Sequence, residues 1–212
     1  MSRRAMTFNL PNLLTLSRIA AIPVVVGCFW LDHWFGRDWA QWAAMVVFVI
    51  ASVTDYFDGW LARRWQMISR LGRFLDPIAD KLLVASVLLM LCGFGTLRGM
   101  HVLAALIILC REILVSGLRE FLAELRVGLP VSGLAKWKTG IQMTSLSVLL
   151  VGDAGPKGFP TMEIGLVLLW AAALLTLITG YDYLRTGLQH MREHEPAAAK
   201  PDAGARSGGS PS

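Results

Sequence analysis

The chain alternates long apolar segments with short polar connections, and this pattern limits the folds that it can adopt. A helix needs about 20 predominantly apolar residues to cross the hydrocarbon core of a bilayer. We therefore expect six membrane helices, at approximately 13–31, 40–63, 77–97, 101–122, 138–152 and 162–184. Only 17% of the 212 residues are charged, whereas a soluble domain carries about 25%. The sequence predicts an all-α integral membrane protein.

Basic residues gather in alternate connections, and this distribution predicts the orientation of the chain. One set of connections holds Arg63, Arg64, Arg70, Arg73, Arg119, Arg126, Lys136 and Lys138. The opposite set holds only Arg37, Arg98 and Lys157. The positive-inside rule then predicts that both termini face the cytoplasm. The net charge of +5 follows from these connections, so we expect no nucleic-acid partner.

The end of the chain differs in composition from the rest. Residues 191–212 are rich in Ala, Pro, Gly and Ser and contain no long apolar run. Such segments cannot bury enough apolar surface to fold. We expect one membrane domain over residues 1–190, followed by a disordered cytoplasmic tail over residues 191–212.

Four aspartates occur near the expected cytoplasmic ends of the second and third helices. Asp55 and Asp58 are three residues apart and Asp76 and Asp80 are four apart, so each pair shares a helix face. We expect a loop between the two helices and Asp76 as the N-cap of the third, because Pro77 follows it. Grouped carboxylates repel one another, and Mg²⁺ prefers oxygen ligands. The pattern predicts a site for two Mg²⁺ (or Mn²⁺) ions that clamp a phosphoryl group.

Other residues near these aspartates suit a phosphorylated ligand. Gly59 leaves room for a ligand beside the helix backbone, and Arg63 can reach a phosphate. Asn12, Thr15 and Arg18 form a polar stripe on the first helix, where they could contact a nucleotide or its phosphates. Two alternatives stay open: ion pairs between the aspartates and nearby basic residues, and interfacial capping and snorkelling by the stripe.

The aspartates belong to a longer pattern, D-x2-D-G-x2-A-R-x8-G-x3-D-x3-D. Its fixed positions are Asp55, Asp58, Gly59, Ala62, Arg63, Gly72, Asp76 and Asp80. With this pattern the chain resembles the CDP-alcohol phosphatidyltransferases, over about residues 7–185. The segments NLPNLLTLSRIAAIP, REILVSGLREF and KWKT are similar to the branch of that family that uses sn-glycerol 3-phosphate.

The resemblance implies a six-helix fold, with a polar cavity that opens to the cytoplasm from a bacterial inner membrane. The implied reaction transfers the phosphatidyl group of CDP-diacylglycerol to sn-glycerol 3-phosphate, giving phosphatidylglycerophosphate and CMP. Membrane lipids would surround the protein, and the resemblance also allows a homodimer.

The resemblance also assigns roles to site residues. Asp55 and Asp76 would bridge the two metals, Asp58 would complete the first and Asp80 the second. Asp80 would also be the general base. Ser69, with Gly59 and Arg63, sits where the family contacts the CDP group.

A dianionic acceptor needs cations, and three are available in the second half of the chain. Arg111 lies inside the fourth span beside Glu112, Arg119 lies eight residues further along, and Lys138 begins the fifth helix. An arginine inside a span is costly and usually lines a cavity, and we expect Arg119 to share the face of Arg111. The alternatives are a buried pair between Arg111 and Glu112, and ordinary positive-inside charge for Lys138.

Two other functions stay open. The same chemistry could serve another acceptor, as in a cardiolipin synthase or an inositol-phosphate or serine phosphatidyltransferase. A divalent-cation transporter would also need membrane carboxylates, but transport sites lie near the bilayer midplane. The aspartates here lie at an expected helix end.

Overall fold

The computed structural model describes residues 10–31, 34, 36–65, 70–124 and 133–193. Side chains are described over 15–31, 34, 36–54, 75–123 and 137–187. Within these residues the chain is helical and contains no strand. The helices are α1 (Leu10–Trp30), α3 (Arg37–Trp65), α4 (Arg70–Gly93), α5 (His101–Glu124), α6 (Gly133–Val151), the short 3₁₀ helix η2 (Gly152–Ala154) and α7 (Thr161–Glu193).

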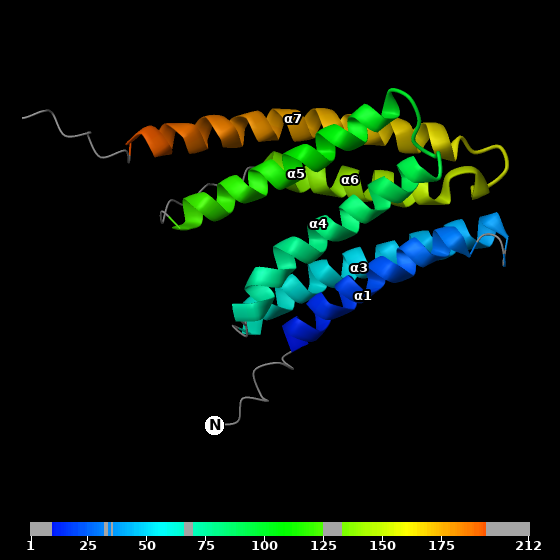
Figure 1. Cartoon of the computed structure of the whole chain (residues 1–212), viewed down its shortest axis with the longest axis horizontal. Coiled ribbons are helices and arrows are strands. Elements are labelled where there is room, and N and C mark those ends of the chain that lie inside the picture. Colours follow the sequence, from blue (N-terminus) through cyan, green and yellow to red (C-terminus); the bar gives the residue numbers. More distant parts are fainter. Residues whose placement is uncertain (1–9, 32–33, 35, 66–69, 125–132, 194–212) are drawn as a thin grey trace, which may run out of the picture.

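Successive long helices run in alternating directions (Figure 1). α1, α4 and α6 begin at one end of the bundle, and α3, α5 and α7 finish at that same end. The first and last helices therefore place the two ends of the described chain on one side. The expected cytoplasmic placement of both termini stays a prediction.

The helices pack as two groups of three. α1 contacts both α3 and α4, α7 contacts both α5 and α6, and contacts between α3 and α6 join the groups. The fully buried large side chains include Phe48, Leu83, Leu91, Ile108, Leu146, Leu149 and Leu169. At Gly165 a Cβ atom would lie 2.8 Å from Leu149, so the glycine allows α6 and α7 to approach closely.

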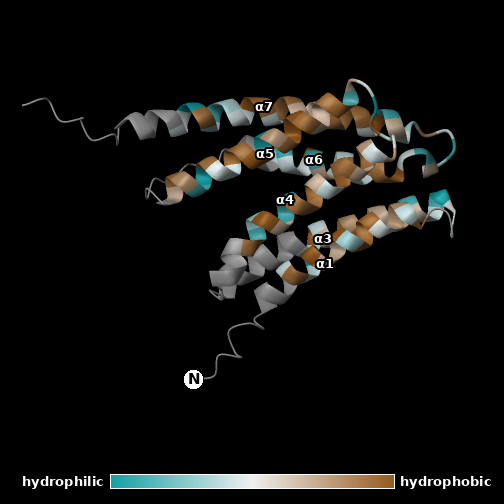
Figure 2. Ribbon diagram, in the orientation of Figure 1, coloured by the Kyte–Doolittle hydropathy of each residue, from teal (hydrophilic) through white to brown (hydrophobic). Residues whose placement is uncertain are grey.

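Hydrophobic residues run along the helices (Figure 2), and many of the large apolar side chains are exposed. Leu89 is 71% exposed and Val167 is 68% exposed, as expected for side chains that face lipid. In the described chain, His101–Ala123 and Thr161–Gly187 are long and apolar enough to cross a membrane by length and composition. Thr15–Trp30 is a shorter apolar helix. No other helix in the described residues meets the same criteria, and six spans stay a prediction.

The expected start of the third helix was wrong. α4 begins at Arg70, and Pro77 lies inside it, so Asp76 is an internal helical residue rather than an N-cap. Proline removes one backbone hydrogen bond and crowds the preceding turn, which penalises a helix without forbidding it. α3 also continues to Trp65, beyond its expected end at residue 63. Fewer residues than expected therefore separate α3 from α4.

The last helix extends beyond the expected end of the membrane domain. α7 continues to Glu193, three residues beyond the expected limit at residue 190. The expected disordered tail lies outside the described residues from position 194 onward.

Candidate active site

The two aspartate pairs lie on α3 and α4, toward the end of the bundle where α1 begins and α7 finishes (Figure 1). Asp76 and Asp80 occupy the same face of α4. Asp55, Asp58, Gly59 and Arg63 belong to the last turns of α3, where only the backbone is described; the likewise predicted Ser69 lies outside the described residues. The structure thus fixes the helices that carry the predicted metal ligands.

A hydrogen bond joins α1 to the carboxylate on α4. Thr15 Oγ1 donates to Asp76 Oδ1, and Thr15 is only 1% exposed. Arg18, the next residue of the predicted polar stripe, is also buried. The side chain of Asn12 is outside the described residues. Two members of the stripe therefore lie inside the bundle, and one of them orients a predicted metal ligand.

Asp80 borders a cavity of about 500 Å³ between α4 and α5. The lining residues are Pro77, Asp80, Lys81, Glu112, Val115, Ser116, Arg119, Glu120 and Ala123. Lys81 Nζ donates to Ser116 Oγ, which in turn donates to Glu120 Oε1 at 3.3 Å. The predicted general base and the predicted acceptor cation Arg119 therefore face one polar cavity.

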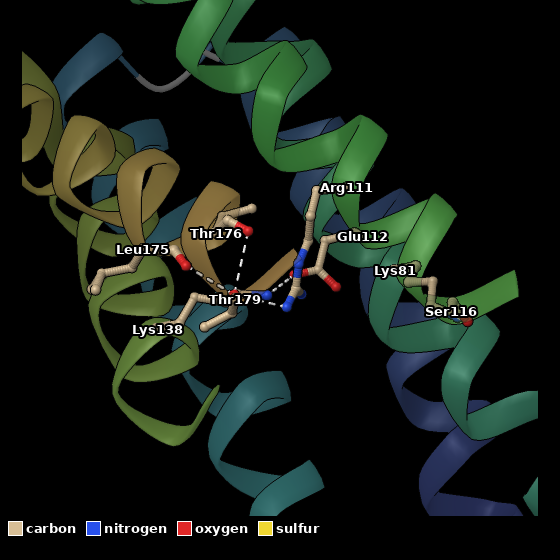
Figure 3. A network of polar contacts seen from close by, with 8 residues as sticks. All are labelled: Lys81, Arg111, Glu112, Ser116, Lys138, Leu175, Thr176 and Thr179. Atoms are coloured by element: carbon tan, nitrogen blue, oxygen red, sulfur yellow. Dashed lines mark hydrogen bonds and ion pairs between the residues drawn. The ribbon is translucent and has the colours of Figure 1, made fainter. Parts of the chain in front are cut away.

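Glu112 brings the other two predicted acceptor cations together (Figure 3). Lys138 Nζ donates to Glu112 Oε1, and Arg111 Nη1 lies 3.6 Å from the same oxygen. Arg111 Nη2 also donates to Thr179 Oγ1 of α7 at 2.9 Å. The pair between Arg111 and Glu112 that was open as an alternative is present, and it includes Lys138.

α7 shapes the position of the Arg111 side chain. A Cβ atom at Gly180 would lie 3.0 Å from Arg111 Cγ, so the glycine makes room for the arginine stem. The Arg111 guanidinium carbon lies 5.9 Å from the ring centroid of Tyr183, within the range of a cation–π contact. Thr179 Oγ1 donates to the Leu175 carbonyl at 2.8 Å, which leaves its lone pairs free to accept from the arginine.

The cation of Lys138 is buried and is neutralised by a neighbouring carboxylate. Lys138 is 3% exposed, and a buried cation needs a charged partner to offset its lost hydration. Glu112 supplies that partner, and Lys138 also interacts electrostatically with Asp80. Since Glu112 also lines the cavity beside Asp80, the cluster and the cavity form one polar region.

Arg111 and Arg119 contact different neighbours, although the sequence suggested that they share a face. Residues eight apart on a helix differ in direction by roughly 80°. Arg111 points toward α7, whereas Arg119 lines the cavity between α4 and α5. Glu112 lies between the two arginines in sequence and contributes to both sets of contacts.

The metal prediction can be tested only through the residues on α4. Among the described side chains, no three Asp, Glu, His or Cys residues lie close enough to hold a metal. The carboxylates of Asp55 and Asp58 are outside that set. Asp76 and Asp80 supply hard oxygen donors from one helix face, and such donors fit Mg²⁺ or Mn²⁺.

Sequence reasoning missed the parts of the site that depend on tertiary packing. Glu112 was expected only as an ion-pair partner of Arg111, and Lys81 only as one of the basic residues that could pair with the aspartates. Ser116 and Thr179 were not predicted to belong to the site. Thr179 carried a usable signal, because a hydroxyl in an apolar span often bonds to a neighbouring helix.

The family model described as CDP-alcohol phosphatidyltransferase matches residues 8–178. The chain belongs to the CDP-alcohol phosphatidyltransferase family. The resemblance seen in the sequence is therefore confirmed. CDP-alcohol phosphatidyltransferases are membrane-associated and generally depend on divalent cations.

Bacterial members of the CDP-alcohol phosphatidyltransferase family align with most of this chain. A protein of Rickettsia bellii is 47% identical over 177 residues, covering 84% of this chain and 94% of that protein. A protein of Pectobacterium atrosepticum is 40% identical, covering 89% of this chain and 100% of that protein. A protein of Cereibacter sphaeroides is 36% identical, covering 90% of this chain and 100% of that protein. All three are named CDP-diacylglycerol–glycerol-3-phosphate 3-phosphatidyltransferase.

Proposed function

We propose that the protein transfers the phosphatidyl group of CDP-diacylglycerol to sn-glycerol 3-phosphate, forming phosphatidylglycerophosphate and releasing CMP. The observation that carries this proposal is the polar cavity that joins Asp80 to Arg119 and to the Glu112 cluster. A carboxylate base beside several cations suits an acceptor that has both a hydroxyl group and a phosphate. The shared name of the relatives supports the same donor and acceptor.

The acceptor would enter the cavity between α4 and α5. Arg119 on its wall would bind the phosphate of glycerol 3-phosphate. Lys138 and Arg111 would add positive potential from the adjoining cluster, where Glu112 holds them in place. This arrangement would direct the acceptor hydroxyl toward Asp80 and keep its phosphate on the α5 side.

The chemical step forms one P–O bond and breaks another. The acceptor hydroxyl oxygen would attack the phosphorus that carries diacylglycerol, and Asp80 would take the hydroxyl proton. The bond from that phosphorus to CMP would break, and CMP would leave with the electron pair. Two divalent cations held by Asp55, Asp58, Asp76 and Asp80 would supply charge neutralisation for the pyrophosphate.

Other residues would orient this machinery. Thr15 would hold the Asp76 carboxylate in one rotamer through its hydrogen bond. Gly59, Arg63 and Ser69 would bind the CDP group, together with Asn12 and Arg18 of the polar stripe. These assignments rest on the matched family pattern and, for all of them except Ser69, on the helices that carry the residues.

We also propose six spans in a bacterial inner membrane, with both termini and the active site facing the cytoplasm. The basic connections and both ends of the described chain support this orientation. CDP-diacylglycerol would reach the site from the bilayer, and glycerol 3-phosphate from the cytoplasm. A homodimer stays a prediction from the sequence.

An acceptor panel tests the proposed function. Purified protein would receive CDP-diacylglycerol and Mg²⁺ with glycerol 3-phosphate, inositol phosphate, serine or phosphatidylglycerol in turn, with CMP release as the readout. We expect CMP release and a phosphatidylglycerophosphate product with glycerol 3-phosphate. Activity with one of the other acceptors and none with glycerol 3-phosphate would overturn the acceptor assignment. Metal movement into liposomes without CMP release would favour a transporter.

A further inference from the structure

A second cavity, of about 240 Å³, lies at the opposite end of the bundle from Asp80. α1 contributes Phe29, and α3 contributes Arg37 and Gln41. The connection between α4 and α5 contributes Phe94 and Arg98. This cavity shares no lining residue with the cavity beside Asp80, and the proposed reaction does not use it.

The cavity is lined by two arginines, although basic residues are rare in the connections at this end of the bundle. The Lys and Arg residues in the connections expected to face away from the cytoplasm are Arg37, Arg98 and Lys157. Two of these three come from different connections and line the same cavity. Because the positive-inside rule disfavours such charges here, their convergence indicates an anionic ligand.

The local backbone directs Arg98 across the connection. Gly95 has φ of +74°, and a Cβ atom at that position would lie 2.5 Å from Arg98 Nη2. The guanidinium therefore folds back over Gly95. The adjacent Leu97 is 1% exposed, and its N–H donates to the Leu91 carbonyl at 2.9 Å. These contacts anchor the segment that carries Arg98.

Arg37 is less constrained by its own partners. It lies 4.0 Å from the Asp153 carboxylate, and both side chains are well exposed. An exposed pair of this kind contributes little, so Arg37 can turn toward an anion in the cavity. Arg37 is also the first residue of α3, and a helix N-terminus carries partial positive charge.

Gln41 favours a ligand that carries a hydrogen-bond donor as well as a negative charge. Its Oε1 atom is buried and accepts no hydrogen bond from the described part of the chain. Arg37, Ala40, Gln41 and Ala44 line the cavity at helical spacing, so they share one face of α3. The short alanine side chains leave the space into which a hydrogen-bond donor of the ligand could reach Gln41.

Aromatic residues form the apolar rim of the cavity. Phe94 packs 5.3 Å from Phe29 and 5.7 Å from Trp30, measured between ring centroids. Trp30 is 69% exposed, and exposed tryptophans at helix ends commonly lie at the membrane interface. The cavity therefore combines two cations, a hydrogen-bond acceptor and an interfacial apolar rim.

We propose that this cavity binds the headgroup of a membrane phospholipid from the leaflet opposite the active site. The phosphate would lie between Arg37 and Arg98. A hydroxyl or ammonium group of the headgroup would donate to Gln41. The acyl chains would follow Trp30 and Phe94 into the bilayer.

Native mass spectrometry of the full chain in detergent tests this site, with phosphatidylglycerol, phosphatidylcholine and inorganic phosphate as separate probes. The test variant is the double change Arg37→Gln and Arg98→Gln. Lys157→Gln is the matched control, because it removes the third cation from the same end without touching the cavity lining. Any lipid bound in the active site is common to all variants, so the difference between them reports this cavity.

The wild-type protein and Lys157→Gln should bind phosphatidylglycerol equally. The double variant should bind it at least about tenfold more weakly, because two charge-assisted contacts are lost. Gln41→Leu should lose the preference for phosphatidylglycerol over phosphatidylcholine, which offers no hydrogen-bond donor. That single variant also keeps the test available if the double variant does not fold.

Three results would overturn the proposal. Unchanged lipid binding by the double variant would show that the two arginines do not bind the lipid. An equal loss of binding in Lys157→Gln would show that only the net positive charge of this end matters. Displacement of the lipid by an equal concentration of inorganic phosphate would identify a free-anion site instead. CMP release by the double variant should stay within about twofold of wild type, because this cavity shares no lining residue with the cavity beside Asp80.

Discussion

The buried Lys138 on α6 forms an ion pair with the partly buried Glu112 on α5, beside the proposed acceptor cavity. Within the described residues α5 and α6 do not pack directly against each other, and both pack on α7. The long side chains of Lys138 and Glu112 therefore bridge a gap between helix backbones. This bridge places a cation close to Asp80 without leaving its charge unbalanced.

Replacing Glu112 by Gln should destabilise the protein and weaken acceptor binding. Lys138 and Arg111 would lose their shared carboxylate, and breaking a buried pair by removing one partner costs about 3 kcal/mol. Thermal unfolding in detergent measures the first effect, and KM for glycerol 3-phosphate measures the second.

Glu163→Gln is the control for Glu112→Gln. Glu163 is an exposed glutamate on α7 that lies outside the acceptor cavity, so its change should alter stability by less than about 0.5 kcal/mol. Equal unfolding temperatures for the two variants would contradict the proposed role of the buried pair.

Replacing Thr15 by Val should weaken metal-dependent activity while preserving the shape of the side chain. The Asp76 carboxylate would lose its hydrogen bond from Oγ1, which is typically a loss of about 1 kcal/mol or roughly fivefold. We expect the Mg²⁺ concentration for half-maximal CMP release to rise by about that factor. Thr15→Ser keeps the hydroxyl and should restore the wild-type value; a shared defect in both variants would sink the orienting role.

Replacing Asp80 by Asn should abolish most of the activity. The variant keeps the side-chain size but removes the proposed proton acceptor, so CMP release should fall at least about a hundredfold. Asp153→Asn, at the opposite end of the bundle, should leave the rate unchanged. Persistent CMP release by Asp80→Asn would contradict the general-base assignment.

Chelation tests the proposed metal requirement independently of any substitution. Removal of divalent cations with EDTA should stop CMP release, because the carboxylates alone cannot neutralise the pyrophosphate. Added Mg²⁺ or Mn²⁺ should restore the rate. Undiminished activity in EDTA, after verified removal of metal, would contradict the two-metal proposal.

Replacing Gly180 by Ala should disturb Arg111 through close packing. The new methyl group would lie 3.0 Å from Arg111 Cγ, and overpacking of this kind costs about 1 kcal/mol or more. Gly117→Ala is the matched control, since nothing lies within 4 Å of its added methyl group. We expect higher thermal stability for Gly117→Ala than for Gly180→Ala, because alanine also favours a helix by up to about 1 kcal/mol. The reverse order would contradict the close contact with Arg111.

The number and order of the long helices could be predicted because each apolar run is long and each break is polar. The expected start of α4 was wrong, because proline is common at the first position of a helix, whereas here seven helical residues precede Pro77. The Arg111–Glu112 pair could be foreseen from adjacency. The addition of Lys138 could not, because it depends on how α5, α6 and α7 pack.

The aspartate pattern identified the family without any structural information, since its spacing is specific. Gln41 and Arg98, in contrast, belong to no sequence motif. Their shared position became apparent only from the structure, in which both line one cavity. Local spacing thus predicts the shared chemistry of the site, whereas packing determines the features particular to this chain.

The two groups of helices also follow the order in which the ribosome makes them. α1, α3 and α4 carry every proposed metal ligand, and the Thr15–Asp76 bond links the first of these helices to the last. The acceptor cations Arg111, Arg119 and Lys138 come later, on α5 and α6, and Arg111 also depends on α7. A nascent chain that stops after α4 would therefore hold the donor half of the site and lack the acceptor half.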